Sequence, residues 1–240
     1  MQSAVQIEVY PTDAEAADAA AALVAAHARA AGKRPTVAVG AGRSGRPVLV
    51  ALASCSDLPW NVVEWFLADE RCGAAADPLA HATVARDSLF GPRGVPASRI
   101  RRPPADADAD VVAAEYATSI AEIVGADGVL DVVVLGIGAD GALGSLVDGA
   151  AALDAPTWVA VVPGDPPRVT VTPALIDRAR HVVVTAIGPD TADAVAATLR
   201  DGRGPAARVL PSERVTWVVD RAAAARLLAD AKPVDDAPGS

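Results

Sequence analysis

Short apolar runs rich in β-branched residues separate longer amphipathic stretches along this sequence. Such runs predict strands buried on both faces of a parallel sheet. We expect strands at 5–10, 36–39, 61–66, 132–135, 158–162 and 181–186. Ala-rich stretches with one apolar face predict helices at about 13–31, 47–53, 110–124 and 190–199. Thr12 or Asp13 is the expected N-cap of the first helix and Asp110 that of the third.

The alternation of strands and helices predicts an α/β fold with helices on both faces of a mostly parallel sheet. The chain has 240 residues, a mass of 24.2 kDa and 52% hydrophobic residues, which is enough for one sizeable core. We therefore expect a single domain over residues 1–231. Residues 232–240 are rich in Pro, Asp and Gly, and we expect them to form a disordered tail.

A glycine-rich loop follows the central predicted strand. Gly136, Gly138 and Gly141 let the backbone adopt positive φ and approach a ligand closely, and Asp140 places a charge within the turn. The leucine spacing in residues 143–146 predicts a short helix after the loop. Its N-terminal amides would point toward the strand end, which indicates a cradle for an anion or another polar ligand.

A second glycine-rich loop, residues 40–45, lies between a predicted strand and a predicted helix. Its pattern, Gly-x-Gly-x-x-Gly, is the fingerprint of dinucleotide-binding proteins in the expected context. Those proteins also carry an acidic residue at the end of the next strand, whereas Glu64 is expected in mid-strand. A dinucleotide site is thus one interpretation, and a simple phosphate cradle is the other.

The strand that contains Glu64 is expected to end in the charged triplet Asp69, Glu70 and Arg71. Ligands bind at this edge of open α/β sheets. In one interpretation, Arg71 binds the substrate or organises the site, with Asp69 and Glu70 as its partners. In the other, an Asp–Arg pair only pins the loop. We favour the first, because folding alone does not require three adjacent charges here.

Residues 130–149 resemble the signature of the 6-phosphogluconolactonase family, in which a strand leads into Gly-x-Gly-x-Asp/Glu-Gly-His-x-x-Ser-Leu-Phe. The matching residues are Gly136, Gly138, Asp140, Gly141, Ser145 and Leu146. The family's His is taken to be the general base that activates water against the lactone carbonyl. Ala142 occupies its position in this chain.

Other motifs extend the resemblance over almost the whole chain. Residues 40–45 are similar to the family loop Ser-Gly-Gly-Arg/Ser-Ser/Thr-Pro, and the matching residues are Gly42, Arg43 and Ser44. Residues 66–72 resemble Trp-Ala-Asp-Glu-Arg-Cys/Tyr-Val. Residues 215–220 match the family's closing strand Thr-Trp-Leu-Leu-Asp, and the resemblance implies an Ala-rich helix from 221.

Two later segments bear on substrate binding. Residues 168–172 resemble the family's Arg-Ile-Thr-Leu-Thr, whose Arg, here Arg168, is expected to face the substrate. Thr191 stands where relatives usually carry a Lys that is thought to contact phosphate.

Residues 77–90 match the family pattern Asp-x-x-Ser-Asn-x-x-x-Ala-Arg-x-x-Leu-Phe in frame, but Ala80 and His81 replace Ser-Asn. A His close to the acidic triplet could serve as a replacement base, because neutral imidazole accepts a proton near neutral pH. The alternative is a solvent-facing His at a helix N-terminus, and the sequence leaves both open.

The resemblance implies a Rossmann-like three-layer α/β/α sandwich of the glucosamine-6-phosphate isomerase/6-phosphogluconolactonase type, and hydrolysis of a sugar lactone. The implied site lies where three loops converge, residues 40–45, 69–71 and 136–141. Candidate catalytic residues are Asp140, Arg71, Asp69, Glu70 and His81. Candidate substrate-binding residues are Gly40, Gly42, Arg43, Ser44, Gly136, Gly138, Gly141 and Arg168. No metal or other cofactor is implied.

Ala142 and Thr191 keep two other functions open. The chain could bind a sugar phosphate without turning it over, or it could have been recruited to different ring chemistry on another substrate. Retained phosphate affinity without hydrolysis would indicate the first, and loss of phosphate affinity the second.

Charge and composition limit the partners. A net charge of −9 argues against nucleic acid, because phosphate backbones require a basic face. No uncharged run approaches the roughly 18 residues that a membrane span needs. The start of the sequence lacks the pattern of a secretory signal, so we expect a cytoplasmic protein with reduced Cys55 and Cys72. We expect a small-molecule substrate and a monomer or small homo-oligomer.

Overall fold

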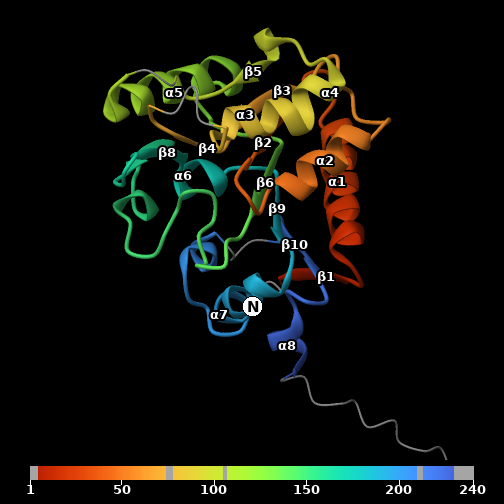
Figure 1. The fold of residues 1–240 in the computed structure, drawn as a ribbon. Coiled ribbons are helices and arrows are strands. Elements are labelled where there is room, and N and C mark those ends of the chain that lie inside the picture. Colours follow the sequence, from red (N-terminus) through yellow and green to blue (C-terminus); the bar gives the residue numbers. More distant parts are fainter. Residues whose placement is uncertain (1–4, 74–77, 105–106, 210–212, 230–240) are drawn as a thin grey trace, which may run out of the picture.

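A seven-stranded sheet forms the centre of the computed structural model, which describes residues 5–73, 78–104, 107–209 and 213–229 (Figure 1). Its strands lie in the order β1-β10-β9-β6-β2-β3-β5, and every neighbouring pair is parallel. They are β1 (Gln6–Tyr10), β2 (Thr36–Val39), β3 (Glu64–Leu67), β5 (Ile100–Arg101), β6 (Val132–Gly136), β9 (His181–Ala186) and β10 (Val215–Asp220). The predicted parallel sheet is confirmed. The predicted tail, 232–240, lies outside the described residues.

The order of the strands reverses between β2 and β6. From β2 the chain moves outward through β3 to β5, returns to β6 beside β2, and then moves the other way to β9 and β10. In open parallel sheets, ligands bind at such a reversal, outside the carboxyl ends of the strands. The segments that follow β2, β3 and β6 therefore border one crevice.

Helices cover both faces of the sheet and complete the predicted three-layer sandwich (Figure 1). On one face lie α1 (Asp13–Ala30), α2 (Arg46–Ser54) and a segment that contains α3 (His81–Ala85), a π-helical turn (Arg86–Phe90) and α4 (Gly91–Arg93). On the other lie α5 (Ala109–Val124) and α7 (Ala192–Leu199). Shorter helices are α6 (Pro173–Ile176), α8 (Ala225–Ala229) and the 3-10 turns Ala97–Arg99, Ala151–Leu153, Pro189–Thr191 and Pro205–Arg208.

Alternation along β6 explains why its run of apolar residues is continuous. Val132 and Val134 pack toward α1 and α2, whereas Val133 and Leu135 pack toward α5. Successive side chains of a strand point to opposite faces, so a sheet covered on both sides needs apolar residues at every position.

A small antiparallel sheet on the α5 side corrects two expectations. It contains β4 (Asp69–Arg71), β8 (Arg168–Val171) and β7 (Val159–Val162), in that order. The charged triplet therefore does not end the preceding strand but forms β4. Ala68 marks the change, because its N–H donates to Val39 in the main sheet while its carbonyl accepts from Val171 in the small one. The segment 158–162, expected as a buried strand, is likewise β7 of the small sheet, and its middle residues are half-buried.

The predicted helix at 143–146 is also absent from the structure. Leu143 and Leu146 exchange backbone hydrogen bonds of 3.0 and 3.1 Å across a tight turn, and Gly144 has a φ of +63°. A turn of this kind buries both leucines just as a helix would, so their spacing did not distinguish the two.

Three element ends differ from expectation. Glu64 is the first residue of β3 rather than a mid-strand residue, because Val62 and Val63 both donate to Pro59 in a turn. Asp108, rather than Asp110, caps α5 by accepting from the Asp110 N–H. The last helix begins at Ala225, not at 221. The first helix is capped as expected by Thr12, which forms a capping box with Glu15.

Within the residues that the structure describes, none of the helices has the length and apolar character to cross a bilayer. The same residues contain no group of three or more His, Cys, Asp or Glu side chains placed to hold a metal ion.

Candidate active site

The loops that follow β2 and β6 touch at the reversal point of the sheet. A Cβ atom on Gly136 would lie 2.7 Å from Ser44 Oγ, so the two loops can meet only because residue 136 is glycine. Gly40 donates to the Val134 carbonyl at 2.9 Å. The structure thus brings together two of the three predicted loops.

The third predicted segment joins them through a buried chain of hydrogen bonds. His81 Nδ1 lies 3.0 Å from Asp69 Oδ1, and Ser145 Oγ donates to Asp69 Oδ2 at 2.5 Å. Arg168 Nη1 lies 3.5 Å from Ser145 Oγ. His81, Asp69 and Ser145 are each at most 6% exposed. The alternative of a solvent-facing His81 is therefore wrong, although His81 does open α3.

The second nitrogen of His81 faces the loop after β2. A Cβ atom on Gly42 would lie 3.5 Å from His81 Nε2. Within the described residues, the N–H groups of Gly42, Arg43 and Ser44 make no hydrogen bond, and the exposed Arg43 side chain has no partner. The ring nitrogen therefore lies beside a loop that carries three amides without a hydrogen bond and one exposed cation. Such amides can bind an anion or an oxyanion.

Charge and burial act in opposite directions on the His81–Asp69 pair. Burial lowers the pKa of His81, but the Asp69 carboxylate and, more weakly, Glu70 outweigh it and raise that pKa to about 8. Burial raises the pKa of Asp69, but His81, Ser145 and Arg168 together hold it below its usual range. At pH 7 the pair is therefore mainly imidazolium and carboxylate.

Glu70 positions the helix that carries His81. Its carboxylate accepts from the N–H groups of His81 at 2.8 Å, Ala82 at 2.7 Å and Arg71 at 2.8 Å. Both oxygens are thus occupied by backbone, and the side chain is 3% exposed. We interpret Glu70 as a positioning residue.

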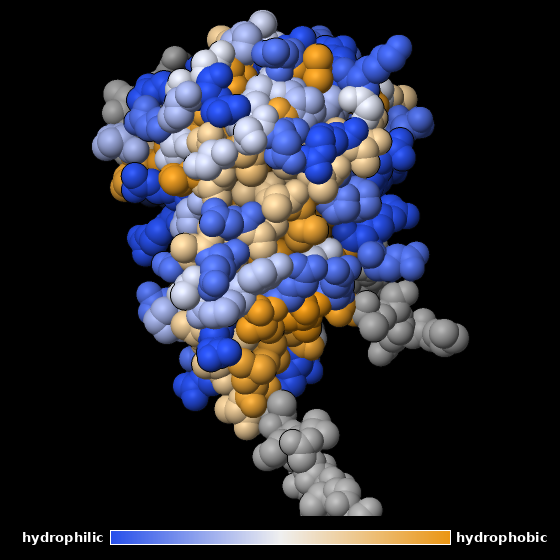
Figure 2. All heavy atoms as spheres, turned by 90° about the vertical axis from the view of Figure 1, so that its right-hand side faces the viewer, coloured by the Kyte–Doolittle hydropathy of each residue, from blue (hydrophilic) through white to orange (hydrophobic). Residues whose placement is uncertain are grey.

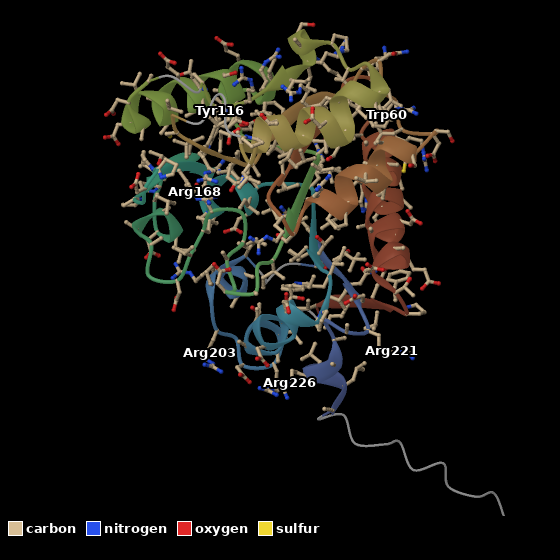
Figure 3. The ribbon with its side chains drawn as sticks, in the orientation of Figure 1. Trp60, Tyr116, Arg168, Arg203, Arg221 and Arg226 are labelled. Atoms are coloured by element: carbon tan, nitrogen blue, oxygen red, sulfur yellow. The ribbon has the colours of Figure 1, made fainter. Side chains whose placement is uncertain are left out.

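Two arginines face each other across the small sheet. Arg71 on β4 is paired directly with Arg168 on β8, and Asp69 is paired with Thr170. Directly opposed side chains of an antiparallel pair lie on one face about 5 Å apart. Both arginines therefore lie on the face of the small sheet that carries Asp69. Figure 3 shows Arg168 on the β8 side of the molecule, below Tyr116 of α5.

Asp140 lies outside the hydrogen-bonded chain. It is exposed, and its Oδ1 accepts from the Ala142 N–H at 3.1 Å within a turn that Gly138 and Gly141 close through backbone hydrogen bonds. The structure gives it no contact with His81 or Asp69.

Some residues that shape the site were not singled out from the sequence. Tyr116 donates to the Leu67 carbonyl at 2.6 Å and fixes the end of β3. Ser145, matched in the family motif but given no role, connects Asp69 to Arg168, and its position in that motif was the available signal. Thr191, in place of the relatives' Lys, is buried and donates to the Gly188 carbonyl.

Comparisons with known proteins agree with this architecture. The 6-phosphogluconolactonase of Streptomyces coelicolor is 31% identical over 235 residues, which cover 89% of this chain and 90% of that protein. The enzyme of the same name from Mycobacterium tuberculosis is 30% identical, over 82% of this chain and 93% of its own. The solved structure of 6-phosphogluconolactonase from Trypanosoma brucei superimposes with a TM-score of 0.80 at 25% identity, and covers 93% of this chain and 99% of its own.

The family model described as glucosamine-6-phosphate isomerases/6-phosphogluconolactonase matches residues 11–217. This range contains all three loops and the His81–Asp69–Ser145 chain. On these grounds, the chain belongs to the glucosamine-6-phosphate isomerase/6-phosphogluconolactonase family.

Proposed function

We propose that this protein opens a sugar lactone ring by water attack, with 6-phosphogluconolactone as the first substrate to test and His81 as the general base. The observation that carries the proposal is the buried contact of 3.0 Å between His81 Nδ1 and Asp69 Oδ1, with His81 Nε2 directed toward Gly42. Relatives named 6-phosphogluconolactonase that are about 30% identical support the choice of substrate.

In the proposed mechanism, neutral His81 takes a proton from water at Nε2 while the water oxygen attacks the lactone carbonyl. Asp69 holds the Nδ1–H and stabilises the imidazolium that forms. Ser145 fixes Asp69 from the other side. The amides of residues 42–44 are the candidate donors to the carbonyl oxygen, which gains negative charge in the transition state. Collapse of the tetrahedral intermediate breaks the ring C–O bond, and His81 returns its proton to the leaving oxygen.

Arg43, Arg71 and Arg168 are the proposed partners of the substrate's anionic group. In a chain of net charge −9, only a local cluster of cations can hold a phosphate. Asp140, which lies in a turn of its own, is proposed to shape the loop rather than to move protons.

The test is lactonase activity on freshly generated 6-phosphogluconolactone, corrected for spontaneous hydrolysis. Replacing His81→Asn should lower kcat by about 10²–10⁴-fold, the usual contribution of a general base. Asp140→Asn is the matched control, because it changes a polar side chain of the adjacent loop outside the hydrogen-bonded chain. A large loss of kcat in Asp140→Asn with little change in His81→Asn would assign the general base to Asp140 rather than to His81.

Ala142 and Thr191 favour a second function, a sugar-phosphate-binding protein without turnover. Neither residue can supply the proton acceptor or the cation that the family pattern has at these positions. Calorimetric titration with 6-phosphogluconate separates the two proposals. Binding together with background-level hydrolysis indicates the binding protein, whereas neither binding nor hydrolysis indicates different ring chemistry.

The remaining expectations are part of the same proposal. We propose one domain over residues 1–231 that acts in the cytoplasm on a small molecule, without a cofactor or nucleic acid, as a monomer or small homo-oligomer. The dinucleotide interpretation of residues 40–45 stays a weaker alternative, which a titration with NAD(P) tests.

A further inference from the structure

A hollow of about 320 Å³ lies at the edge of the sheet opposite the candidate active site. It is formed where β2, β3 and β5 begin, whereas the loops of the site follow the ends of their strands. Glu64 in this hollow and Asp69 in the site are five residues apart, or about 16 Å along an extended chain. Its lining residues are Lys33, Arg34, Val62, Glu64, Ser98, Arg99 and Arg101.

Positive charge exceeds negative charge in this hollow. Its lining holds four cationic side chains and one carboxylate, that of Glu64. Oxygen Oε1 of Glu64 already accepts from Arg34 at 3.0 and 3.1 Å and from Arg99 at 2.9 Å. Arg101 Nη2 lies 3.6 Å from Oε2, and exposed Lys33 contacts no charged partner in the described residues. One carboxylate therefore cannot neutralise the cluster.

The second oxygen of Glu64 lacks a hydrogen-bond donor. The Glu64 side chain is 3% exposed, and Oε2 is buried without a hydrogen bond. Buried carboxylate oxygens normally accept hydrogen bonds, because they lose water on burial. Arg101 Nη2, 3.6 Å from this oxygen, makes no hydrogen bond to it and so remains a donor at the hollow.

We propose that this hollow binds a small phosphate ester. The phosphate oxygens accept from Arg101, Arg99 and Lys33. Guanidinium groups match the geometry of phosphate oxygens, which favours phosphate over a simple halide. A volume near the lower end of the range for ligand pockets, roughly 300 to 1,000 Å³, limits the ligand to a few carbon atoms beside the phosphate.

The test is calorimetric titration of the full chain at low ionic strength with glycerol 3-phosphate as the probe. Arg101→Gln keeps the hydrogen bonds of Arg34 and Arg99 to Glu64 and should weaken binding at least tenfold, the typical loss of a hydrogen bond to a charged group. Lys33→Gln, which removes an exposed side chain, should weaken binding about threefold, as for an exposed ion pair. Glycerol, which has no phosphate, should not bind the native protein measurably.

Two control variants remove the same charge elsewhere. Arg221→Gln changes an exposed arginine after β10 and should leave binding of the probe unchanged (Figure 3). Arg43→Gln changes the loop of the candidate active site and identifies any binding of the probe there. The proposal is overturned if the native protein does not bind the probe, or if Arg43→Gln abolishes binding while Arg101→Gln and Lys33→Gln leave it unchanged. Urea unfolding of each variant verifies that it is folded.

Discussion

At the scale of single residues, the protonation of His81 decides what the candidate site can do. The imidazole is buried, which disfavours its charged form, yet it lies 3.0 Å from a carboxylate that favours that form more strongly. With a pKa of about 8, His81 is mainly protonated at pH 7 and becomes the neutral base as the pH rises. A reaction that uses His81 as its base should therefore accelerate up to about pH 8 and then level off.

Replacing Asp69→Asn should lower the pKa of His81 from about 8 toward the ordinary value of about 6.5 or below it. The physical reason is that burial then acts without the opposing carboxylate. NMR titration of the imidazole measures this directly, since the three His residues of the chain can be assigned by substitution.

The pH–rate profile gives a second, independent measure of the same change. Its midpoint should move to lower pH in Asp69→Asn, with a lower plateau because Nδ1–H loses its charged acceptor. Asp140→Asn is the control and should leave the His81 titration unchanged. An unchanged titration in Asp69→Asn would mean that the pair does not control the proton.

At the scale of elements, the position of His81 depends on a helix that is not stable by itself. The α3 helix has only five residues, well below the length at which isolated helices form in water. The Glu70 carboxylate binds its first two N–H groups, and Asp69 of the same strand binds the imidazole. One face of β4 thus holds the imidazole of His81, through Asp69. The other face holds the start of α3, through Glu70.

A stacked pair of histidines joins α1 to β9. The rings of His27 and His181 are stacked, with their centres 3.6 Å apart and an angle of 14° between their planes. Burial lowers the pKa of His27, and the neighbouring His181 lowers it further. Burial also lowers the pKa of His181, with added effects of Arg180 and Arg214 that outweigh the attraction of Asp131.

Because both pKa values are lower in the folded state, the contribution of this pair to the free energy of unfolding should be highest above pH 6.5 and should fall as the pH drops below that value. His27→Phe keeps a stacked ring without a charge and should reduce this acid sensitivity. Urea unfolding of both proteins at pH 5 and pH 7.5 provides the comparison. Equal pH dependence in the two proteins would show that the pair has no part in acid sensitivity.

The pH dependence of stability has the opposite sign for His81. Its raised pKa stabilises the fold below pH 6.5 and ceases to do so above pH 8.

At the scale of the whole molecule, the main sheet could be predicted and the small sheet could not. Strands such as Val132–Gly136 are buried on both faces, so an uninterrupted apolar run identifies them without knowledge of their neighbours. Asp69–Arg71 has no such pattern, and it is a strand only because residues 168–170, a hundred positions later, pair with it. Apolar side chains gather in the lower part of the face shown in Figure 2. The exposure of Ile7 and Val9 was equally unpredictable, since both follow the pattern of buried strand residues.

The candidate site was predictable in its loops but not in its connections. Glycines and charges after strand ends mark where ligands bind, and these marks lie within short stretches of sequence. The contact of Ser145 with Asp69 spans 76 residues and depends on the strand order, which the local pattern does not contain. His81 illustrates the limit, because its residue type suggested a base while its burial could be known only from the packed structure.

The meeting of the two loops at the sheet reversal yields a final prediction. A Cβ atom on Gly136 would lie 2.7 Å from both the carbonyl carbon and the Oγ of Ser44, so Gly136→Ala forces backbone to move rather than a flexible side chain. We expect a loss of about 1–3 kcal/mol in the free energy of unfolding, the usual cost of overpacking, together with loss of ligand binding. Gly40→Ala is the matched control.

In Gly40→Ala, the added Cβ atom lies 3.4 Å from Leu135 Cδ2, at the limit of ordinary contact with a side chain that can shift. Urea unfolding should therefore place Gly40→Ala close to the native protein and Gly136→Ala clearly below it. Because Gly136 ends β6 and Ser44 follows β2, the clash separates the two halves of the sheet at the crevice between them. Equal stabilities of the two variants would mean that the halves tolerate separation, and that the site does not depend on their close contact.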